Sequence, residues 1–580
     1  MTKARPTPRQ PADNPFIRLA PVLLLLATWV QAGPGPDPSE AATPPASAIA
    51  SAHPLATAAG FEVLEAGGNA FDAAVAVGAA LGVVEPYGSG LGGGGFWLLH
   101  RADDGLQVML DGRERAPLAA HRDLYLDAEG RPIPGLSLDG ALAAGIPGTP
   151  AALAHLARHY GRLPLARSLA PAVRLAREGF PADAHYRRLA ERRAPALRRS
   201  PAAAAQFLAK GSAETQPGSE VPSEGQLVRQ PDLAATLEAL ARDGHAGFYA
   251  GPVAEALVAG VRAAGGIWTT EDLAQYRALE RAPITVDYRG WRLVSAAPPS
   301  SGGVLLAEML HMLARFDLDA LDPTARAHLL AEVMRRAYRD RAAYLGDPDF
   351  VEVPVARLTH PLYAAGLARD IDPDRTTPSA GCDGPPGGTD TTHYAILDRE
   401  GNRVSATLSI NTPFGSGLVP PGTGVLLNNE MDDFSASPGT PNAYGLTGGA
   451  ANAIAPGKRM LSSMSPTFLE SEAGVAILGT PGGSRIVTMV LQAVLAAVAG
   501  EGPADWVAKP RLHHQFLPDK IQYEPGALSP EQVAGLEAKG HRLEPVTAGF
   551  GNMQAVYWDR AAHRVLAASD PRGMGQAEVR

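Results

Sequence analysis

Two hydroxyl side chains, Thr391 and Ser409, are the first residues in this sequence whose types and spacing suggest chemistry. Residues 391–398 alternate as a strand does, residues 399–402 have the composition of a turn, and residues 403–410 alternate again. This pattern predicts a β-hairpin. With the turn centred near residue 400, position 391 lies opposite position 409, where the Cβ atoms of cross-strand neighbours are typically about 5 Å apart. We therefore expect the two hydroxyls to meet at the open end of the hairpin.

The hydroxyl of Thr391 needs a nearby base, because threonine is a weak nucleophile at neutral pH. A free α-amino group titrates at about 7.7–8.0, so a cut before Thr391 would create a suitable base on the same residue. Residues 371–390 are rich in Asp, Pro, Gly and Thr, which predicts a flexible, exposed linker that lets the two new ends separate. Taken alone, Thr391 is best interpreted as an ordinary strand threonine, and only further motifs change that interpretation.

A second feature, the glycine pair Gly482-Gly483, could stabilise negative charge. The sequence predicts a strand at Val475–Leu478 before the pair and a helix from Ser484 to about Ala499 after it. Backbone N–H groups at such a junction point outward and carry the positive end of the helix, which suits an oxyanion hole. A simple tight turn explains the two glycines equally well.

Apolar helices and another glycine run are predicted around these strands. Residues 53–85 have a helical apolar pattern that is interrupted at Gly67-Gly68-Asn69. The second apolar helix, at about Ala70–Val84, is too short to cross a bilayer, so we interpret it as a buried helix. Gly88–Gly95 precedes a predicted strand at Phe96–His100. No Gly-Lys-Ser/Thr follows this run, so we interpret it as a tight, closely packed turn and not as a phosphate loop.

The composition limits the class of protein. The chain has 580 residues, 45% of them apolar and 19% charged, which indicates several globular domains or one large layered body. The net charge of −9 is spread along the chain, which argues against a nucleic-acid partner. Cys382 is the one cysteine, so disulfides within the chain and a multi-cysteine zinc site are excluded.

The N-terminus has the pattern of an export signal. Basic residues up to Arg18 precede an apolar run at Leu19–Val30, and Val30-Gln31-Ala32 offers the small residues of a cleavage site. We expect a signal peptide at residues 1–32, a Pro/Ala/Ser-rich linker at 33–45 and a periplasmic or secreted protein. An uncleaved membrane anchor is the alternative, although the apolar run is short for a span of about 20 residues.

From Asp390-Thr391-Thr392-His393-Tyr394 onward the sequence resembles the start of the small subunit of γ-glutamyltranspeptidases, and the resemblance covers nearly all of the chain after the predicted signal. Further stretches carry it in order: His53-Pro54-Leu55, Glu65–Ala70, Gly90–Gly95, Arg113–Pro117, Pro298–Gly303, Leu345–Phe350, Leu426–Phe434, Leu461–Pro466 and Pro481–Arg485. A single such string would be weak evidence, but this many in order is specific.

The resemblance implies a four-layer αββα N-terminal-nucleophile hydrolase sandwich, whose precursor cuts itself between Asp390 and Thr391. A large subunit (46–390) and a small subunit (391–580) would stay together as a heterodimer. Thr391 would attack the γ-glutamyl amide of glutathione or a related compound. It would then pass the acyl group to water or to an amino-acid or dipeptide acceptor, without a metal or an organic cofactor.

The resemblance also implies a role for each polar residue of the site. Ser409, where many relatives carry threonine, would hydrogen-bond the nucleophile, and Gly482 and Gly483 would hold the oxyanion. The residues implied to bind the donor are Arg113, Ser462 and Ser463 for its α-carboxylate, Asn411, Glu430 and Asp433 for its α-ammonium group, and Tyr444, in the loop 438–449, as a cover over the pocket. Taken singly, each has an ordinary structural explanation as an ion pair, cap or loop residue.

Two other functions fit parts of the same pattern. A cephalosporin or glutaryl acylase would share the fold and the nucleophile, but Asp433 and Asn411 would then have no amine to hold. An inactive secreted binding protein could keep the scaffold, and the intact Thr391, Arg113 and glycine pair argue against it.

Overall fold

The computed structural model describes residues 43–580 except 210–219, 381–390, 438 and 548. The predicted signal peptide (1–32), most of the predicted linker (33–45), Cys382 and Asp390 lie outside the described residues. No helix of the described part has the length and apolar character needed to cross a bilayer.

Two antiparallel sheets form the centre of the fold. The strands of the first, in spatial order, are β18 (Gln576–Val579), β1 (Ala48–Ser51), β9 (Thr392–Leu397), β10 (Arg403–Ser409), β2 (Gly94–His100), β3 (Gln107–Gly112) and β6 (Leu279–Arg281). Those of the second are β17 (Arg564–Ser569), β16 (Gln554–Asp559), β12 (Gly474–Gly479), β11 (Thr467–Glu470), β8 (Trp291–Ser295) and β7 (Ile284–Tyr288). Both sheets therefore combine strands from either side of position 391.

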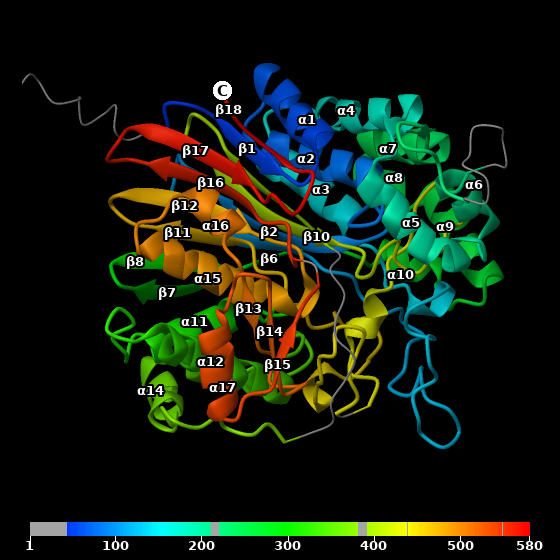
Figure 1. The fold of residues 1–580 in the computed structure, drawn as a ribbon. Coiled ribbons are helices and arrows are strands. Elements are labelled where there is room, and N and C mark those ends of the chain that lie inside the picture. Colours follow the sequence, from blue (N-terminus) through cyan, green and yellow to red (C-terminus); the bar gives the residue numbers. More distant parts are fainter. Residues whose placement is uncertain (1–42, 210–219, 381–390, 438, 548) are drawn as a thin grey trace, which may run out of the picture. The chain divides into compact units, whose positions relative to one another are not determined.

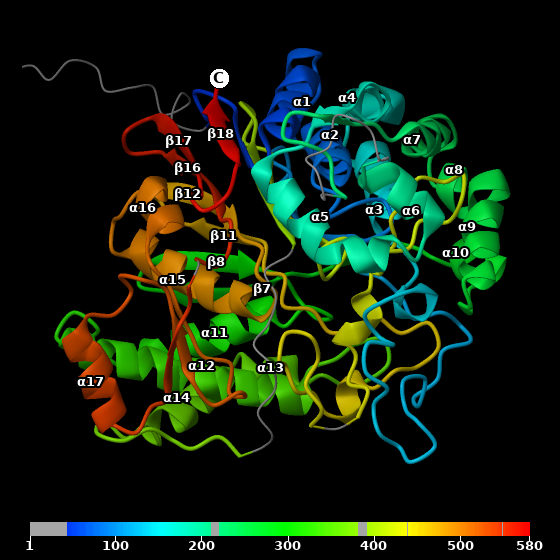
Figure 2. The ribbon, with the colours of Figure 1, turned by 45° about the vertical axis from the view of Figure 1, so that its right-hand side comes forward.

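Helices cover the outer face of each sheet. On the first sheet, α1 (Pro54–Glu65), α2 (Ala70–Val84) and α3 (Thr149–His159) pack against the strands, α4 (Leu165–Glu178) packs on α2, and α7 (Pro231–Asp243) packs on α4. Those on the second include α11 (Gly302–Leu313), α12 (Pro323–Tyr344) and α15 (Ile486–Val498). Figures 1 and 2 show the two groups on opposite sides of the paired sheets. The expected αββα order is confirmed.

The alternation of side chains along β9 explains the layering. Tyr394 and Ile396 belong to the apolar cluster shared with α2, whereas Ala395 and Leu397 belong to the cluster between the two sheets. At Gly479 of β12 a Cβ atom would collide with the ring of His393, so glycine is required for the sheets to approach at this point.

The remaining elements complete the frame. The other helices are α5 (Ala184–Leu197), α6 (Pro201–Phe207), α8 (Ala246–Tyr249), α9 (Gly251–Ala263), α10 (Thr270–Ala274), α13 (Val355–Leu358), α14 (Pro361–Arg369), α16 (Pro503–Ala508) and α17 (Pro530–Ala538). Two small sheets contain β4 (Phe180–Pro181) with β5 (Leu227–Val228), and β13 (Leu512–His513) with β14 (Ile521–Tyr523) and β15 (Leu543–Pro545).

The predicted helix pair near the N-terminus is confirmed. The α1 helix ends at Glu65. Asn69 caps α2, because its side-chain oxygen accepts from the N–H of Asp72 and the Asp72 carboxylate accepts from the N–H of Asn69. The glycine run is closely packed, as expected. A Cβ on Gly92 would collide with the carbonyl oxygen of Leu426, and one on Gly93 with that of Ser409.

The predicted linker differs from expectation where it is described. Residues 371–380 lack regular structure, as predicted, but they are not free. Arg335 of α12 donates to the hydroxyls of Thr376 and Ser379, at 2.9 Å and 2.6 Å. The buried carboxylate of Glu332 accepts from Thr377 N–H at 3.1 Å. Composition predicted the irregular backbone but could not predict the partners that hold it.

Candidate active site

The predicted hairpin is present with the predicted register. Residues 403–408 pair with 397–392, which places position 391 directly opposite position 409. The hydroxyl oxygens of Thr391 and Ser409 lie 3.4 Å apart. Asn411 N–H donates to the Ser409 hydroxyl oxygen at 2.8 Å, so Ser409 accepts there and keeps its own proton for another acceptor.

Most of the predicted site residues line one pocket beside this hydroxyl pair. They are Thr391, Ser409, Gly483, Arg113, Asn411, Glu430, Asp433, Tyr444, Ser462 and Ser463. Gly482 is the one predicted residue that does not line it, although it precedes Gly483 directly. The structure thus brings together residues from both sides of position 391.

Arg113 is the electrostatic centre of the pocket. It follows the end of β3, is 1% exposed, and pairs with Glu430 at 2.8 Å and Asp433 at 2.5 Å. A third carboxylate, Glu114, lies 3.5 Å away. Burial raises the pKa of Glu430 and of Glu114 above the usual carboxylate range. The charge of Asp433 adds to the rise for Glu430, and the charge of Glu430 adds to the rise for Glu114. The pocket therefore contains oppositely charged groups that water reaches poorly.

The segment that carries Ser462 and Ser463 is tied to Arg113. The guanidinium donates to the carbonyl oxygens of Met460 at 3.2 Å and Leu461 at 3.3 Å. Ser462 N–H donates to the carbonyl of Pro299 at 2.8 Å, which joins the segment to the start of α11. The two serines are thus fixed beside the guanidinium from two directions.

The glycine pair adopts backbone conformations that favour glycine. Gly482 has φ of 138° and Gly483 has φ of 56°. A single 3₁₀ turn (Gly483–Arg485) precedes α15, so the regular helix begins two residues later than the predicted Ser484. Within the described part of the chain, neither glycine N–H donates a hydrogen bond. Two N–H groups at the start of a helical turn are consequently available to an anion.

Tyr444 covers the glycine pair. A Cβ on Gly483 would collide with its ring, and its hydroxyl donates to the carbonyl of Asn411 at 2.6 Å. The loop is fixed next to the charged residues because the amide of Asn442 donates to Asp433 at 2.9 Å. Asn411 itself donates through its side chain to the carbonyl of Asn429 at 2.9 Å.

Comparison with known proteins now decides the family. The family model described as Gamma-glutamyltranspeptidase matches residues 56–579. The chain belongs to the γ-glutamyltranspeptidase family. It is therefore an enzyme of the γ-glutamyltranspeptidase type with the N-terminal-nucleophile hydrolase fold.

Three relatives of the γ-glutamyltranspeptidase family are informative. The glutathione hydrolase proenzyme of Escherichia coli (strain K12) is 42% identical over 535 residues, which cover 91% of this chain and 90% of the relative. The chain in a crystal structure of Helicobacter pylori γ-glutamyltranspeptidase is 42% identical in sequence. The match covers 56% of this chain and 92% of that chain, with a TM-score of 0.54. A cephalosporin acylase from Bacillus halodurans is 30% identical, covers 96% and 99%, and has a TM-score of 0.78.

Sequence reasoning missed two buried charged residues of this family member. Arg341 of α12 lines the pocket, and its position within a charged helical stretch gave no signal. Glu85, which ends α2, accepts from the Thr392 hydroxyl at 2.8 Å, next to the predicted nucleophile. Burial raises the pKa of Glu85 to about 7. An acidic residue directly after an apolar helix was the signal that could have identified it.

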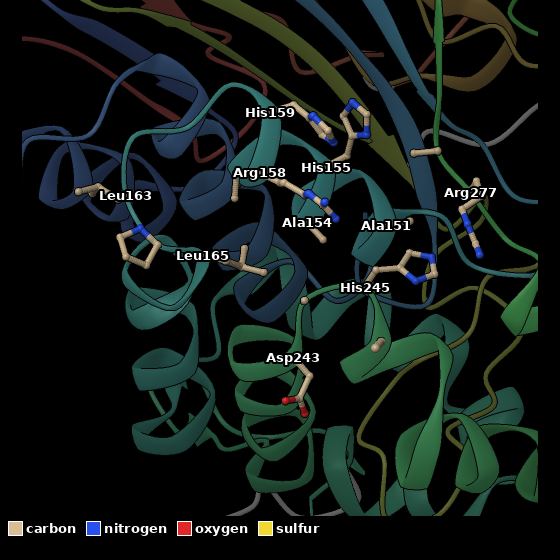
Figure 3. Close-up of a pocket in the computed structure, with 15 residues that line it drawn as sticks. Ala151, Ala154, His155, Arg158, His159, Leu163, Leu165, Asp243, His245 and Arg277 are labelled. Carbon is tan, nitrogen blue, oxygen red and sulfur yellow. The ribbon is translucent and has the colours of Figure 1, made fainter.

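A second pocket lies elsewhere on the γ-glutamyltranspeptidase fold and contains none of the predicted residues. His155, Arg158 and His159 of α3 line it, with His245 and Arg277 from the region of α8 and α10 (Figure 3). Among the described residues, no group of three or more His, Cys, Asp or Glu side chains is arranged to hold a metal ion.

Proposed function

We propose that the protein is a γ-glutamyltransferase and glutathione hydrolase in which Thr391 is the nucleophile. The observation that carries this proposal is the Thr391–Ser409 hydroxyl pair in a pocket that is also lined by Arg113, Glu430 and Asp433. A nucleophile beside paired buried charges suits a donor that carries both an anion and a cation next to the reacting acyl group.

The proposal includes activation by self-cleavage. The Thr391 hydroxyl attacks the carbonyl carbon of Asp390, the C–N bond between the two residues breaks, and the nitrogen becomes the free α-amine of Thr391. Water then hydrolyses the resulting ester, which leaves one chain that ends at Asp390 and one that begins at Thr391. The relatives named as proenzymes support this step.

In the mature enzyme, the α-amine of Thr391 accepts the proton of its own hydroxyl as that oxygen attacks the γ-carbonyl carbon of the donor. Ser409 donates to the nucleophile oxygen, and the N–H groups of Gly482 and Gly483 stabilise the oxyanion. The leaving amine, cysteinylglycine when glutathione is the donor, takes the proton. Water or an amino-acid or dipeptide acceptor then attacks the ester, and Thr391 is regenerated.

Donor binding would proceed by exchange of ion-pair partners. The α-carboxylate of the donor would pair with the Arg113 guanidinium and accept hydrogen bonds from the hydroxyls of Ser462 and Ser463. The α-ammonium group would pair with the carboxylates of Glu430 and Asp433 and donate to the side-chain oxygen of Asn411. Each buried charge then keeps a partner, which avoids the cost of an isolated buried ion. Tyr444 would cover the bound donor.

An acylase activity is the second candidate, because the structural similarity to a cephalosporin acylase extends over 96% of the chain. The two carboxylates beside Arg113 favour a donor with an amine, which a glutaryl group lacks. We expect γ-glutamyl anilide to be turned over at least about 100-fold faster than glutaryl anilide, the difference that one unpaired buried charge makes. Turnover of the glutaryl compound alone would replace this proposal with the acylase.

We also propose that residues 1–32 direct export and are removed, and that the two fragments remain one heterodimer. The basic and apolar pattern at the N-terminus supports the first point, and the sharing of both sheets supports the second. The N-terminal mass of the large fragment from exported protein would test the signal site.

A further inference from the structure

Arg341 is a buried guanidinium that the proposed mechanism does not use. It extends from α12 into the same pocket as Thr391 and is 5% exposed. Its Nε donates to the Ser301 hydroxyl at 3.2 Å, and its Nη2 donates to the Ser463 hydroxyl at 3.3 Å. No carboxylate of the described chain lies within 4.0 Å of its nitrogens. Asp433 acts on Arg341 only at longer range, and a buried arginine with no carboxylate at ion-pair distance is costly.

The directions of the surrounding hydrogen bonds explain why a buried arginine lies at this position. A guanidinium only donates, so Ser463 accepts from Arg341 and its own proton points elsewhere. Ser462 likewise accepts, from the N–H of Met464 at 3.1 Å. Among the described residues, no acceptor takes the hydroxyl proton of either serine. Both hydroxyls are therefore set as donors at the pocket wall.

Ser301 extends the same arrangement. Its hydroxyl accepts from Arg341 and donates to the carbonyl oxygen of Ser462 at 2.9 Å, and its N–H donates to that oxygen at 2.8 Å. Arg341 thus holds the 462–463 segment in two ways: directly at the Ser463 hydroxyl, and through Ser301 at the Ser462 carbonyl oxygen. This contact also explains the Pro298–Gly303 motif, whose backbone carries Ser301 to the segment.

The charge balance indicates what the two hydroxyls meet. Arg113 already faces Glu430, Asp433 and Glu114, whereas Arg341 has hydroxyl partners alone in the described chain. A carboxylate that enters between Arg113 and Ser463 would gain two hydroxyl donors and the field of a second cation close behind them.

We propose that Arg341 is a positioning residue that holds Ser463 and Ser462 as donors to the α-carboxylate of the γ-glutamyl donor. This inference rests on the proposed function. The arginine acts through Ser463 and Ser301 and contacts no reacting atom. Its removal lets the serine hydroxyls turn and takes a cation from the carboxylate, so it weakens recognition of that one group.

The test measures kcat/KM for two donor substrates, each with the wild-type enzyme and with Arg341→Met. One donor is γ-glutamyl anilide, and the other is the same anilide with its α-carboxylate converted to a carboxamide. We expect Arg341→Met to lower kcat/KM for the carboxylate donor about 10- to 100-fold, mainly through KM, because charge-assisted hydrogen bonds are lost. For the carboxamide donor we expect a loss of less than about threefold, well below one such bond. Equal losses for both donors, or no loss for either, would overturn the inference.

Matched variants distinguish a loss of positioning by Arg341 from a loss of folding. Arg341→Lys keeps the cation but not the two-pronged contact, so it should recover part of the KM. Arg341→Met with Ser463→Ala should lose less than the product of the two single losses, because part of the arginine's effect passes through Ser463. Arg339→Met, on the same helix with a half-exposed side chain beside Asp340, should behave as wild type. Inability of the wild-type enzyme to use γ-glutamyl anilide would reject the proposed function instead, and self-cleavage on a gel reports whether each variant folds.

Discussion

At the scale of the residue, Ser409 lies beside the proposed nucleophile, with its hydroxyl oxygen 3.4 Å from that of Thr391. Ser409→Ala removes the hydroxyl that we propose donates to the Thr391 oxygen. We expect kcat to fall about 10- to 100-fold, the value of one hydrogen bond to a charged group in the transition state. Ser409→Thr retains the hydroxyl and should stay within about threefold of wild type. Steady-state kinetics with γ-glutamyl anilide measure both, and an unimpaired alanine variant would rule out this role.

Glu430 gives a pH dependence. Burial raises the pKa of Glu430 above the usual carboxylate range, so its carboxylate becomes protonated while the solution is still only mildly acidic. A neutral Glu430 no longer attracts the donor's ammonium group, and kcat/KM should therefore decline as pH falls below neutral. Glu430→Gln is uncharged at every pH, so its kcat/KM at pH 8 should be lower than that of the wild type. The part of the decline that comes from Glu430 should disappear, while the part that comes from protonation of the Thr391 α-amine should remain. An unchanged pH profile in Glu430→Gln would contradict the assignment.

The sequence predicted most of the residues that line the pocket, because each of them lies in a short motif that can be recognised without knowledge of the fold. It could not predict Arg341 or Glu114, whose importance comes from burial next to other charges. A charged residue inside a helical stretch has the same appearance whether it faces solvent or the core. Only the packing of α12 against the 462–463 segment distinguishes the two.

At the scale of the element, the hairpin β9–β10 could be predicted with its register because alternation and a Gly-Asn turn are local signals. The helix pair α1–α2 was equally clear from its apolar pattern and the interruption at Gly67-Gly68-Asn69, although the role of Asn69 as the N-cap of α2 was not predicted. The bonds that hold residues 376–379 to α12 could not be predicted, since they join segments about 40 residues apart through buried side chains.

Glu85 connects the end of α2 to the nucleophile strand and should make stability depend on pH. Its pKa is raised to about 7 in the folded protein, so the folded state binds this proton more tightly than the unfolded chain does. The cost of ionising it is absent below about pH 4, grows as pH rises to 7, and reaches about 3 kcal/mol above that. Glu85→Gln keeps an acceptor for Thr392 and removes this cost.

We therefore expect Glu85→Gln to raise the urea midpoint of unfolding at pH 8 and to leave it unchanged at pH 4. The measurement is best made in a Thr391→Ala background, which we expect to remain a single chain. A shift of the same size at both pH values would show that the effect of the substitution is unrelated to ionisation.

At the scale of the whole molecule, the two proposed subunits interleave within both sheets. In the first sheet β1 of the large subunit lies between β18 and β9 of the small subunit, and in the second β8 pairs with β11. Separating the subunits would expose both apolar cores. We expect the cleaved protein to elute as one species of about the precursor's size in native gel filtration, and to separate only in denaturant. Dissociation in dilute native buffer would contradict this arrangement.

In the proposed mechanism, Thr391 becomes the N-terminal nucleophile by self-cleavage. Intact-mass measurement of purified wild-type protein and of Thr391→Ala tests it most directly. The account predicts a wild-type fragment whose mass equals that of residues 391–580, and a Thr391→Ala protein that is uncut and inactive. A wild-type cut at another bond, or normal cleavage of Thr391→Ala, would contradict the account.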